Sequence, residues 1–392
     1  MAKVVFFCIP AWGHTNPTLG VVRELVRRGH QVWYWSYEQF RDAVVAAGAV
    51  FVSCDAYDAE QRLTPADGAR VAKDLAFATK VLTDTTLALD EAACREMERL
   101  KPDCIVADSM AVWGKAVALK LGIPFVSSTT TFAFNRHSAQ VMKQGLGALV
   151  KLLVSMPKIN RQVRRLQERG YPIRNILDII QNDDNTHTIV YTSPGFQPSA
   201  ETFSDRYAFV GPVLRNAQAP FSKVREKLIY LSMGTVNNDL LPLYRACIDA
   251  LGRLDCQLVL SVGDQVPLTA FGALPENVQI YPRVDQIAVL EQADVFITHC
   301  GMNSVSEALW FGVPLVLLPQ TAEQNGVAVR AEALGAGLRP EEESGRAIAA
   351  AVGSILAEPG FRANAEKIRR DLRSCGGAKA AADKIEQVLR LQ

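Results

Sequence analysis

The sequence predicts an α/β protein with parallel sheets. Along the whole chain, short apolar runs rich in β-branched residues alternate with longer segments of helical periodicity, which is typical of parallel strands joined by helical crossovers. The expected strands of the first half are 4–10, 31–36, 50–54, 104–107, 124–128 and 188–191. Those of the second half are 228–233, 257–262, 278–281, 295–298, 314–319 and 336–338. The pattern therefore predicts two α/β halves.

The length supports two domains. At roughly 100–200 residues per domain, a chain of 392 residues can form two domains that each bury a core. The segment 211–220 lacks apolar periodicity and is bracketed by prolines, as is typical of a linker. The last segment carries Ile385 and Val388 at helical spacing, and such a face needs a partner surface. We expect a first domain at 1–212, a linker at 213–225, a second domain at 226–377 and a helix at 378–392 that docks back across the linker.

The composition is that of an ordinary globular protein. It is 49% hydrophobic, and 42 Lys+Arg against 41 Asp+Glu give a formal net charge of +1, which provides no overall field for binding nucleic acid or an anionic membrane. The eight cysteines form no C-x-x-C pair and no cluster with histidine at metal spacing, so we expect reduced thiols in a cytoplasmic protein. The first apolar run is too short for a signal peptide, and no apolar run is long enough to span a membrane.

The stretch 151–174 is strongly basic, with seven Lys/Arg and a single acid, Glu168. It predicts an amphipathic helix with a solvated basic face, and a mobile flap beside a binding cleft is the alternative. The residues expected to face inward are Leu152, Leu153, Val163 and Leu166. Nucleic-acid binding is the least expected function of this stretch, because no aromatic residue interleaves the basic ones before Tyr171.

A histidine follows the first expected strand. His14 lies in the segment 10–18, and loops at the carboxyl ends of strands bind ligands in open α/β sheets. Gly13 lets the backbone approach a ligand, and Pro17 stiffens the start of the following helix. Because its ordinary pKa is near neutrality, histidine is the natural candidate for a general base. The alternative is that His14 caps its own helix.

Asp108 is the candidate partner of His14. It ends the apolar run 104–107, and the carboxyl ends of strands in one sheet converge. By accepting from one ring nitrogen, Asp108 would fix the tautomer of His14 and stabilise the imidazolium that forms when the other nitrogen takes a proton. The alternative for Asp108 is a helix N-cap.

The second half carries a stronger signal in the segment 299–308. This segment follows an expected strand and opens a helix, so its backbone amides favour a phosphate. Asn303 and Ser304 add side-chain donors, and Glu307 can accept from the two hydroxyls of a ribose. A second strand-end loop, 319–324, offers acceptors and an amide for sugar hydroxyls. Taken singly, each segment could also be an ordinary capped helix start.

These motifs resemble those of a known family. The residues from 281 to 324 that carry the resemblance are Asp285, Gln286, His299, Cys300, Gly301, Asn303, Ser304, Glu307, Pro319, Glu323 and Gln324. They resemble the donor-binding signature of family 1 nucleotide-sugar glycosyltransferases. With Gly13-His14-x-Asn16-Pro17 and the segments 201–203, 210–212 and 231–235, the chain looks most like the bacterial macrolide glycosyltransferase branch, which includes antibiotic-inactivating and flavonoid-glucosylating enzymes. The resemblance is weakest over 55–100 and 135–185.

The resemblance implies a GT-B architecture, in which two Rossmann-like domains face each other across a cleft. The first domain would bind the acceptor, with His14 as base and Asp108 as its orienting partner, and the second would bind the nucleotide sugar. The implied donor contacts are Thr235, His299, Gly301, Asn303 and Ser304 to the diphosphate, Glu307 to the ribose, Glu323 and Gln324 to the sugar, and Arg283, Val284 and Gln286 near the nucleobase. Plant relatives have Trp-x-Pro-Gln where this chain has 283–286. An arginine plane can still stack on a pyrimidine, and the choice between uracil and thymine stays open.

The expected reaction is an inverting transfer of glucose from UDP-glucose. The sugar leaves through an oxocarbenium-like transition state, the helix terminus and His299 stabilise the leaving diphosphate, and His14 takes the proton of the acceptor hydroxyl. No metal or other cofactor is expected, because the helix terminus neutralises the diphosphate and no Asp-x-Asp pair lies on a strand-end loop.

The expected acceptor is a hydrophobic small molecule such as a macrolide, a flavonoid or another polyphenol. Residues that could line its pocket, each equally suited to the core, are Trp12, Phe77, Trp113, Phe132, Phe134 and Met142. Two other functions stay open: a nucleotide-sugar 2-epimerase-like enzyme, and a non-catalytic nucleotide-sugar-binding helper, against which the pair of His14 and Asp108 argues. We expect no nucleic-acid partner, no integral membrane association, and a monomer or weak dimer.

Overall fold

The chain forms two compact units, each built on one parallel sheet. The computed structural model describes residues 1–58, 67, 70, 74–135, 137–138, 146–180, 182, 185–235 and 237–391. Unit 1 comprises Met1–Ser193, Gln197–Val213 and Cys375–Gln392, and unit 2 comprises Pro194–Phe196 and Leu214–Ser374. The predicted α/β class with parallel sheets is confirmed.

Unit 1 contains a seven-stranded sheet whose paired strands all run parallel. Its strands are β1 (Lys3–Phe7), β2 (Gln31–Ser36), β3 (Val50–Ser53), β4 (Cys104–Asp108), β5 (Phe125–Thr129), β6 (His187–Val190) and β7 (Tyr207–Phe209), in the order β3-β2-β1-β4-β5-β6-β7. The six strands expected in this half are all present. The sequence analysis missed β7, because a run of three residues carries too little alternation to be told from a loop.

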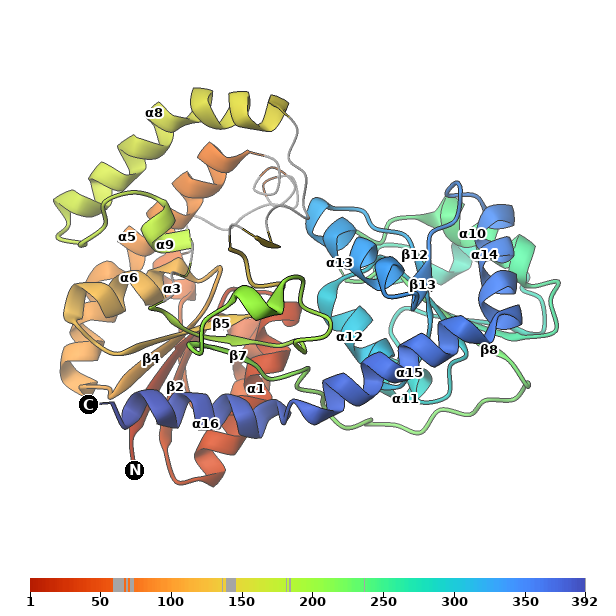
Figure 1. The fold of residues 1–392 in the computed structure, drawn as a ribbon, viewed down its shortest axis with the longest axis horizontal. Coiled ribbons are helices and arrows are strands. Elements are labelled where there is room, and N and C mark those ends of the chain that lie inside the picture. The colour runs from red at the N-terminus through yellow and green to blue at the C-terminus, as the bar shows by residue number, and fades with distance from the viewer. Residues whose placement is uncertain are drawn as a thin grey trace. The chain divides into compact units, whose positions relative to one another are not determined.

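Helices flank this sheet (Figure 1). They are α1 (Trp12–Arg27), α2 (Arg41–Ala46), α3 (Asp55–Asp58), α5 (Leu75–Leu100), α6 (Val112–Leu121), α8 (Leu146–Glu168), α9 (Leu177–Ile180) and α16 (Gly377–Leu389), with short 3₁₀ turns at Glu38–Phe40 and Ala200–Thr202. Helix α5 packs against α6 and α8, and α16 lies beside α1 and contacts strands β4 to β7.

Helix α8 covers most of the basic stretch and is amphipathic where its side chains are described. Val163 and Leu166 are buried, and Lys158, Arg161 and Arg164 are exposed. The side chains of Leu152 and Leu153 lie outside the described part of the structure. The described residues therefore fit the predicted amphipathic helix with a solvated basic face.

Unit 2 contains a six-stranded sheet, again with parallel pairs throughout. Its strands are β8 (Leu228–Ser232), β9 (Gln257–Ser261), β10 (Val278–Tyr281), β11 (Val295–Thr298), β12 (Leu315–Leu317) and β13 (Gly337–Leu338), in the order β10-β9-β8-β11-β12-β13. Its helices are α10 (Leu241–Leu251), α11 (Gln286–Leu290), α12 (Met302–Trp310), α13 (Ala322–Ala333), α14 (Gly345–Ala357) and α15 (Pro359–Ser374), with a 3₁₀ turn at Leu268–Phe271.

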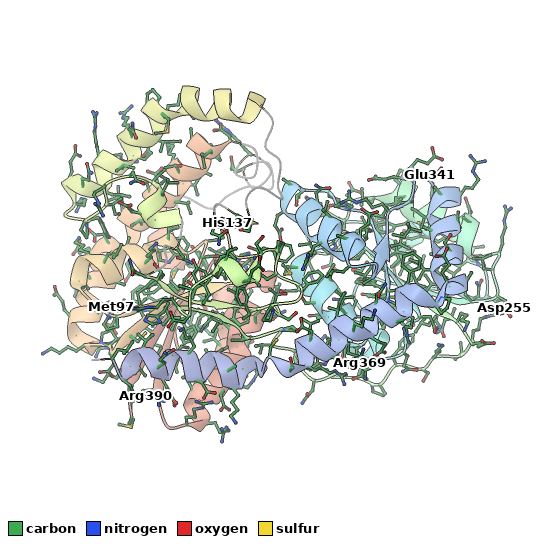
Figure 2. All side chains as sticks on the ribbon, in the orientation of Figure 1. Met97, His137, Asp255, Glu341, Arg369 and Arg390 are labelled. Carbon is green, nitrogen blue, oxygen red and sulfur yellow. The ribbon has the colours of Figure 1, made fainter. Side chains whose placement is uncertain are left out.

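Each unit buries an apolar core around its sheet and carries charged residues on its surface. In unit 1, Met97 on α5 lies in the core, with 1% of its surface exposed. In unit 2, Asp255 and Glu341 project from the surface (Figure 2). No described helix is long and apolar enough to cross a membrane.

The first strand of each sheet lies in its interior, which determines where ligands can bind. Strand β1 lies between β2 and β4, and β8 lies between β9 and β11. The chain therefore leaves β1 and β8 on one side and later returns on the other, and open α/β sheets bind ligands at the carboxyl ends of strands where this reversal occurs. The segments that follow β1 and β4 in unit 1, and β8 and β11 in unit 2, are thus the places for functional residues.

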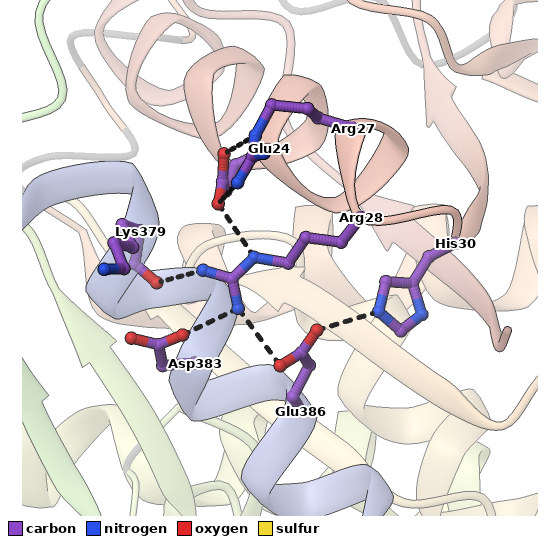
Figure 3. A network of polar contacts seen from close by, with 7 residues as sticks. All are labelled: Glu24, Arg27, Arg28, His30, Lys379, Asp383 and Glu386. Carbon is purple, nitrogen blue, oxygen red and sulfur yellow. Dashed lines mark hydrogen bonds and ion pairs between the residues drawn. The ribbon is translucent and has the colours of Figure 1, made fainter.

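Helix α16 brings the end of the chain back to unit 1. Arg28, just after α1, donates to Asp383 at 2.6 Å and to Glu386 at 3.0 Å, and also to Glu24 at 2.8 Å (Figure 3). His30 contacts the other oxygen of Glu386 at 3.0 Å. The residues of α16 that are buried in the core of this unit are Ala381, Ala382, Ile385 and Val388. Both polar and apolar contacts therefore hold α16 on unit 1.

Candidate active site

His14 lies on the first turn of α1, and not in a loop as the sequence analysis expected. Helix α1 begins at Trp12 with Ala11 as N-cap, so Pro17 lies inside the helix and not at its start. Ala11 makes no side-chain cap, and the side chain of His14 turns to a neighbouring strand. The interpretation of His14 as a helix cap is therefore wrong.

His14 and Asp108 form a close pair. The Nδ1 atom of His14 lies 2.7 Å from Oδ2 of Asp108, whose side chain has no exposed surface, whereas the imidazole is 20% exposed. The other oxygen, Oδ1, accepts from the backbone N–H of Met110 at 2.8 Å. Helix α6 begins later, with Ala111 as N-cap, so Asp108 is not a helix cap. Strands β1 and β4 are neighbours, which is why their carboxyl ends bring the two residues together.

The carboxylate fixes the tautomer of His14. A carboxylate can only accept, so Nδ1 carries the proton and the lone pair of the neutral ring is on Nε2. Burial, together with the charge of Asp108, raises the pKa of Cys8, Tyr34 and Tyr191 above their ordinary values. These three groups are therefore neutral, and Asp108 supplies the negative charge of this cluster.

Thr130 also reaches His14 and was not found from the sequence. It directly follows β5, it is buried, and its Oγ1 lies 3.0 Å from Nδ1 of His14. The signal that could have found it is the run of threonines 129–131 at the end of an expected strand. Strand β5 pairs with β4, so the end of this strand lies beside Asp108.

In unit 2, α12 begins without a capping side chain. Gly301 is the N-cap, without a side chain that could bond to the first turn. Cys300 turns the chain with a φ of 66°, and the first N–H groups of a helix have no partner within it. The first turn contains no acidic residue, so the partial positive charge there is not neutralised locally. Asn303 and Ser304 lie in this turn, as predicted.

His299 lies in a slot between two glycines. A Cβ on Gly234 would lie 2.7 Å from Nε2 of His299, and a Cβ on Gly301 would lie 2.6 Å from the same atom. Burial lowers the pKa of His299 to about 4, so the ring is neutral at pH 7. Its Nδ1 is buried, with no hydrogen-bond partner among the described residues. A contact from His299 to a diphosphate would therefore be a neutral hydrogen bond.

The other predicted donor residues gather along the same edge of this sheet. Thr235 is exposed in the loop after β8, which pairs with β11. Gln286 donates to Glu307 at 2.5 Å and accepts from the hydroxyl of Tyr230 at 3.2 Å. Burial raises the pKa of Glu307. Gln286, expected at the nucleobase, and Glu307, expected at the ribose, are thus hydrogen-bonded to each other.

Two further residues were expected near the nucleobase. Arg283 is exposed after β10, and its guanidinium pairs with Asp264, with Nε at 3.0 Å from the carboxylate. Val284 is half-buried. Asp285 binds the linker, accepting from Arg215 at 2.6 Å. The plane of Arg283 is thus held at the surface of unit 2 by an acid that the sequence analysis had not considered.

Gln324 has a structural task that changes its expected role. Its Oε1 accepts from the backbone N–H groups of Gln320 at 2.8 Å and Thr321 at 3.2 Å, while Thr321 accepts from the backbone of Gln324 at 3.3 Å. This is a capping box at the start of α13. Because Oε1 already accepts two hydrogen bonds, the amide nitrogen of Gln324 is the group that could donate to a sugar. Glu323 is exposed beside it.

Comparison with known proteins identifies the family. The model described as "Erythromycin biosynthesis protein CIII-like, C-terminal domain" matches residues 245–387. The whole chain is 31% identical to the uncharacterized UDP-glucosyltransferase YojK of Bacillus subtilis, covering 98% of that protein. It is 32% identical to the NDP-glycosyltransferase YjiC of Bacillus licheniformis, over 98% of this chain and 97% of the relative. The chain is a family 1 glycosyltransferase.

A solved structure supports the same assignment for the fold. The glycotransferase of kitacinnamycin matches this glycosyltransferase with a TM-score of 0.87 and 29% identity, over 99% of this chain and 98% of the other. The predicted GT-B fold, with its two parallel-sheet α/β units, is confirmed.

The residues expected to line an acceptor pocket of this glycosyltransferase differ in how exposed they are. Trp12 and Phe134 are 41% and 42% exposed, and Phe77 is half-buried beneath Arg70. Trp113 is 3% exposed and packs with the strands of unit 1, which fits the alternative that it is a core residue. The remaining two are Phe132, which is 4% exposed, and Met142, which lies outside the described residues.

No metal centre is evident in the described part of the enzyme. There, no three His, Cys, Asp or Glu side chains gather closely enough to hold a metal ion. All eight cysteines are free thiols. Among the groups described above, His14 in unit 1 can transfer a proton, and the start of α12 in unit 2 can form hydrogen bonds to an anion.

Proposed function

We propose that this glycosyltransferase moves glucose from UDP-glucose to a hydroxyl of a hydrophobic natural product, with inversion at the anomeric carbon. The observation that carries the proposal is the 2.7 Å contact between His14 and the buried Asp108. Relatives named as a UDP-glucosyltransferase and an NDP-glycosyltransferase support a nucleotide-sugar donor. The match to an erythromycin biosynthesis family supports a macrolide or a similar acceptor.

His14 acts as the general base. With its proton held on Nδ1 by Asp108, the neutral ring takes the acceptor's hydroxyl proton on Nε2, and Asp108 stabilises the imidazolium that results. The acceptor oxygen then attacks the anomeric carbon from the face opposite the diphosphate. A single displacement of this kind converts an α-linked donor into a β-glycoside.

The start of α12 receives the diphosphate. The backbone amides at the start of α12, the hydroxyl of Ser304 and neutral His299 stabilise the charge of the leaving group without reorganising. Glu307 accepts from the ribose, and Glu323 with the amide nitrogen of Gln324 serves the sugar. Because these protein groups offset the charge of the diphosphate, we propose that the transfer needs no metal.

The test is an assay with UDP-glucose and a panel of phenolic and macrolide acceptors, read by mass spectrometry. We expect a mass gain of one hexose, a β-linkage in the proton spectrum of the product, and the same rate with a chelator present. Running dTDP-glucose in parallel assigns the nucleobase. Binding of donor without transfer to any acceptor would contradict the proposal and favour a nucleotide-sugar-binding helper.

A further inference from the structure

Two oxygen atoms from neighbouring strands approach the same nitrogen of His14. Oδ2 of Asp108, at the end of β4, lies 2.7 Å from Nδ1, and Oγ1 of Thr130, just after β5, lies 3.0 Å from it. Both side chains are buried, with Thr130 only 3% exposed. The established pairing of a histidine with a carboxylate accounts for Asp108 and leaves the threonine without an assigned role.

The proton on Nδ1 decides what the threonine can do. An imidazole nitrogen carries one hydrogen, and the carboxylate of Asp108 requires it to be present. The hydroxyl oxygen of Thr130 therefore acts as a second acceptor of the same N–H, and its own hydrogen points away from Nδ1. One N–H shared between two acceptors is a three-centre hydrogen bond.

We propose that Thr130 is a positioning residue that, together with Asp108, orients the imidazole of His14 and stabilises its protonated form. The inference rests on the proposed function, in which His14 is the base. Two acceptors from different strands restrain rotation of the ring more than one does. Hydrogen bonds from a charged donor are stronger than those from a neutral one, so the contact from Thr130 strengthens as His14 takes the proton.

Three titratable groups of the described residues respond to the charge of Asp108. They are Cys8 after β1, Tyr34 on β2 and Tyr191 after β6, and the pKa of each is raised by burial together with that charge. They stay neutral wherever His14 titrates, so their charge does not change in that range. A change at Thr130 can thus be read directly in His14.

The test uses two variants of Thr130 and a matched control. T130V replaces the hydroxyl by a methyl group of similar size, and T130S keeps the hydroxyl. T129V is the control, because Thr129 is the preceding residue and equally buried, and its Oγ1 has no hydrogen-bond partner among the described residues.

The first measurement needs no substrate. The chain has five histidines, so ¹⁵N-detected titration of the ligand-free protein resolves each ring, and the spectrum of H14A assigns His14. We expect the pKa of His14 to fall in T130V, because its cation loses an acceptor, and to return to the wild-type value in T130S. T129V should leave it unchanged.

The second measurement is the pH profile of transfer. In T130V we expect kcat to fall about threefold to tenfold, as for the loss of one hydrogen bond, with KM for donor and acceptor nearly unchanged. The acidic limb of kcat/KM should move to lower pH, because a weaker base loses its proton at lower pH. T130S should restore both.

The outcomes separate this inference from the proposed function. The role of Thr130 is overturned if T130V keeps the wild-type pKa of His14, or if T130S does not restore that pKa. This holds even when sugar transfer is normal. A rise in KM without a pKa change also overturns it and makes Thr130 a substrate contact. If the wild type transfers no sugar but the His14 pKa responds as expected, the contact is upheld and the proposed function fails.

Discussion

The tautomer of His14 decides which of its nitrogens can act on a hydroxyl. Because the carboxylate of Asp108 accepts from Nδ1, the neutral ring keeps its lone pair on Nε2. The side chain of Asp108 has no exposed surface, so water screens its charge only weakly and the imidazolium is stabilised more than it would be in solvent. Replacing either partner should therefore affect proton transfer more than binding.

We predict that His14→Ala slows transfer to an aliphatic alcohol by about 10²–10⁴-fold, the usual contribution of a general base. Affinity for UDP, measured by calorimetry, should stay near the wild-type value, because α12 belongs to the other unit. A phenol that is already ionised at the assay pH needs the base less, so its rate should fall less. An aliphatic acceptor that reacts within a few-fold of wild type would remove His14 from the mechanism.

We predict that Gly301→Ala weakens UDP binding by about tenfold or more, the equivalent of one hydrogen bond to a charged group. The φ of Gly301 is −61°, which alanine adopts without strain, but its Cβ would lie 2.6 Å from the ring of His299 and displace it.

Gly353→Ala is the matched control for this prediction. It adds a methyl group on α14 where nothing lies within 4 Å, and there alanine should raise helix stability. Calorimetry with UDP and the thermal midpoint of both variants check the prediction. An unchanged affinity in Gly301→Ala would show that the slot around His299 does not serve the diphosphate.

At the scale of elements, two helices of unit 2 begin in opposite ways. Helix α12 has glycine as its N-cap, which supplies no capping side chain, whereas α13 is closed by the capping box of Thr321 and Gln324. Both follow neighbouring strands, β11 and β12. The start of α12 thus lacks a side-chain cap, as the proposed diphosphate site requires, and the start of α13 is satisfied by its own residues.

The two tasks of Gln324 should separate by mutation. Gln324→Ala removes the capping oxygen and should lower stability by about 0.5–1 kcal/mol, whereas Gln324→Glu keeps an acceptor oxygen for the cap and loses the amide donor. We predict that both variants narrow the kcat/KM ratio between glucose and deoxy-sugar donors, and that only the alanine variant melts earlier. If the kcat/KM ratio between glucose and deoxy-sugar donors is unchanged in both variants, Gln324 caps α13 and does not bind the sugar.

The elements were largely predictable from the sequence because buried parallel strands are continuous apolar runs. The family was likewise predicted from its motifs, and His14 with Asp108 followed from the ends of two such runs. What the sequence left open depends on three-dimensional neighbours: Trp113 suits a core or a pocket equally and packs in the core, and Thr130 reaches His14 because β5 lies beside β4. The apolar pattern does not give the strand order, so beyond the pair of His14 and Asp108 it could not show which strand-end residues meet.

At the scale of the molecule, Arg28 connects α16 to the rest of unit 1. We predict that Arg28→Met lowers the free energy of unfolding by about 1–2 kcal/mol at pH 7, because these partly exposed pairs are screened by solvent. Arg27→Met is the control: Arg27 pairs with the same Glu24, at 2.7 Å, but is 70% exposed, and no contact to α16 is seen for it in Figure 3. It should change stability little. Urea denaturation of the three proteins measures the difference.

The effect of Arg28→Met should depend on pH. Contacts with His30 and then Arg28 lower the pKa of Glu386, and contacts with Arg27 and Arg28 lower that of Glu24 to about 2. A carboxylate with a lowered pKa stabilises the fold above its ordinary pKa and loses that contribution as the pH falls through its folded value. The difference in the free energy of unfolding between wild type and Arg28→Met should therefore shrink as the pH falls below about 4.5. A gap that is constant with pH would mean that Arg28 acts by packing alone.

The return of the chain to unit 1 has a consequence for engineering hybrids with relatives. A chimera that takes everything after Val213 from another glycosyltransferase would also import a foreign last helix, and that helix would meet Arg28 and the apolar surface of the native first half. Two crossover points are needed, after Val213 and after Ser374, so that residues 375–392 stay with the half they complete. Grafts made this way exchange residues 214–374 of unit 2 and leave the unit that carries His14 with its own last helix, while Gly195 and Phe196 of the native chain would meet the foreign counterparts of Asp371 and Arg330.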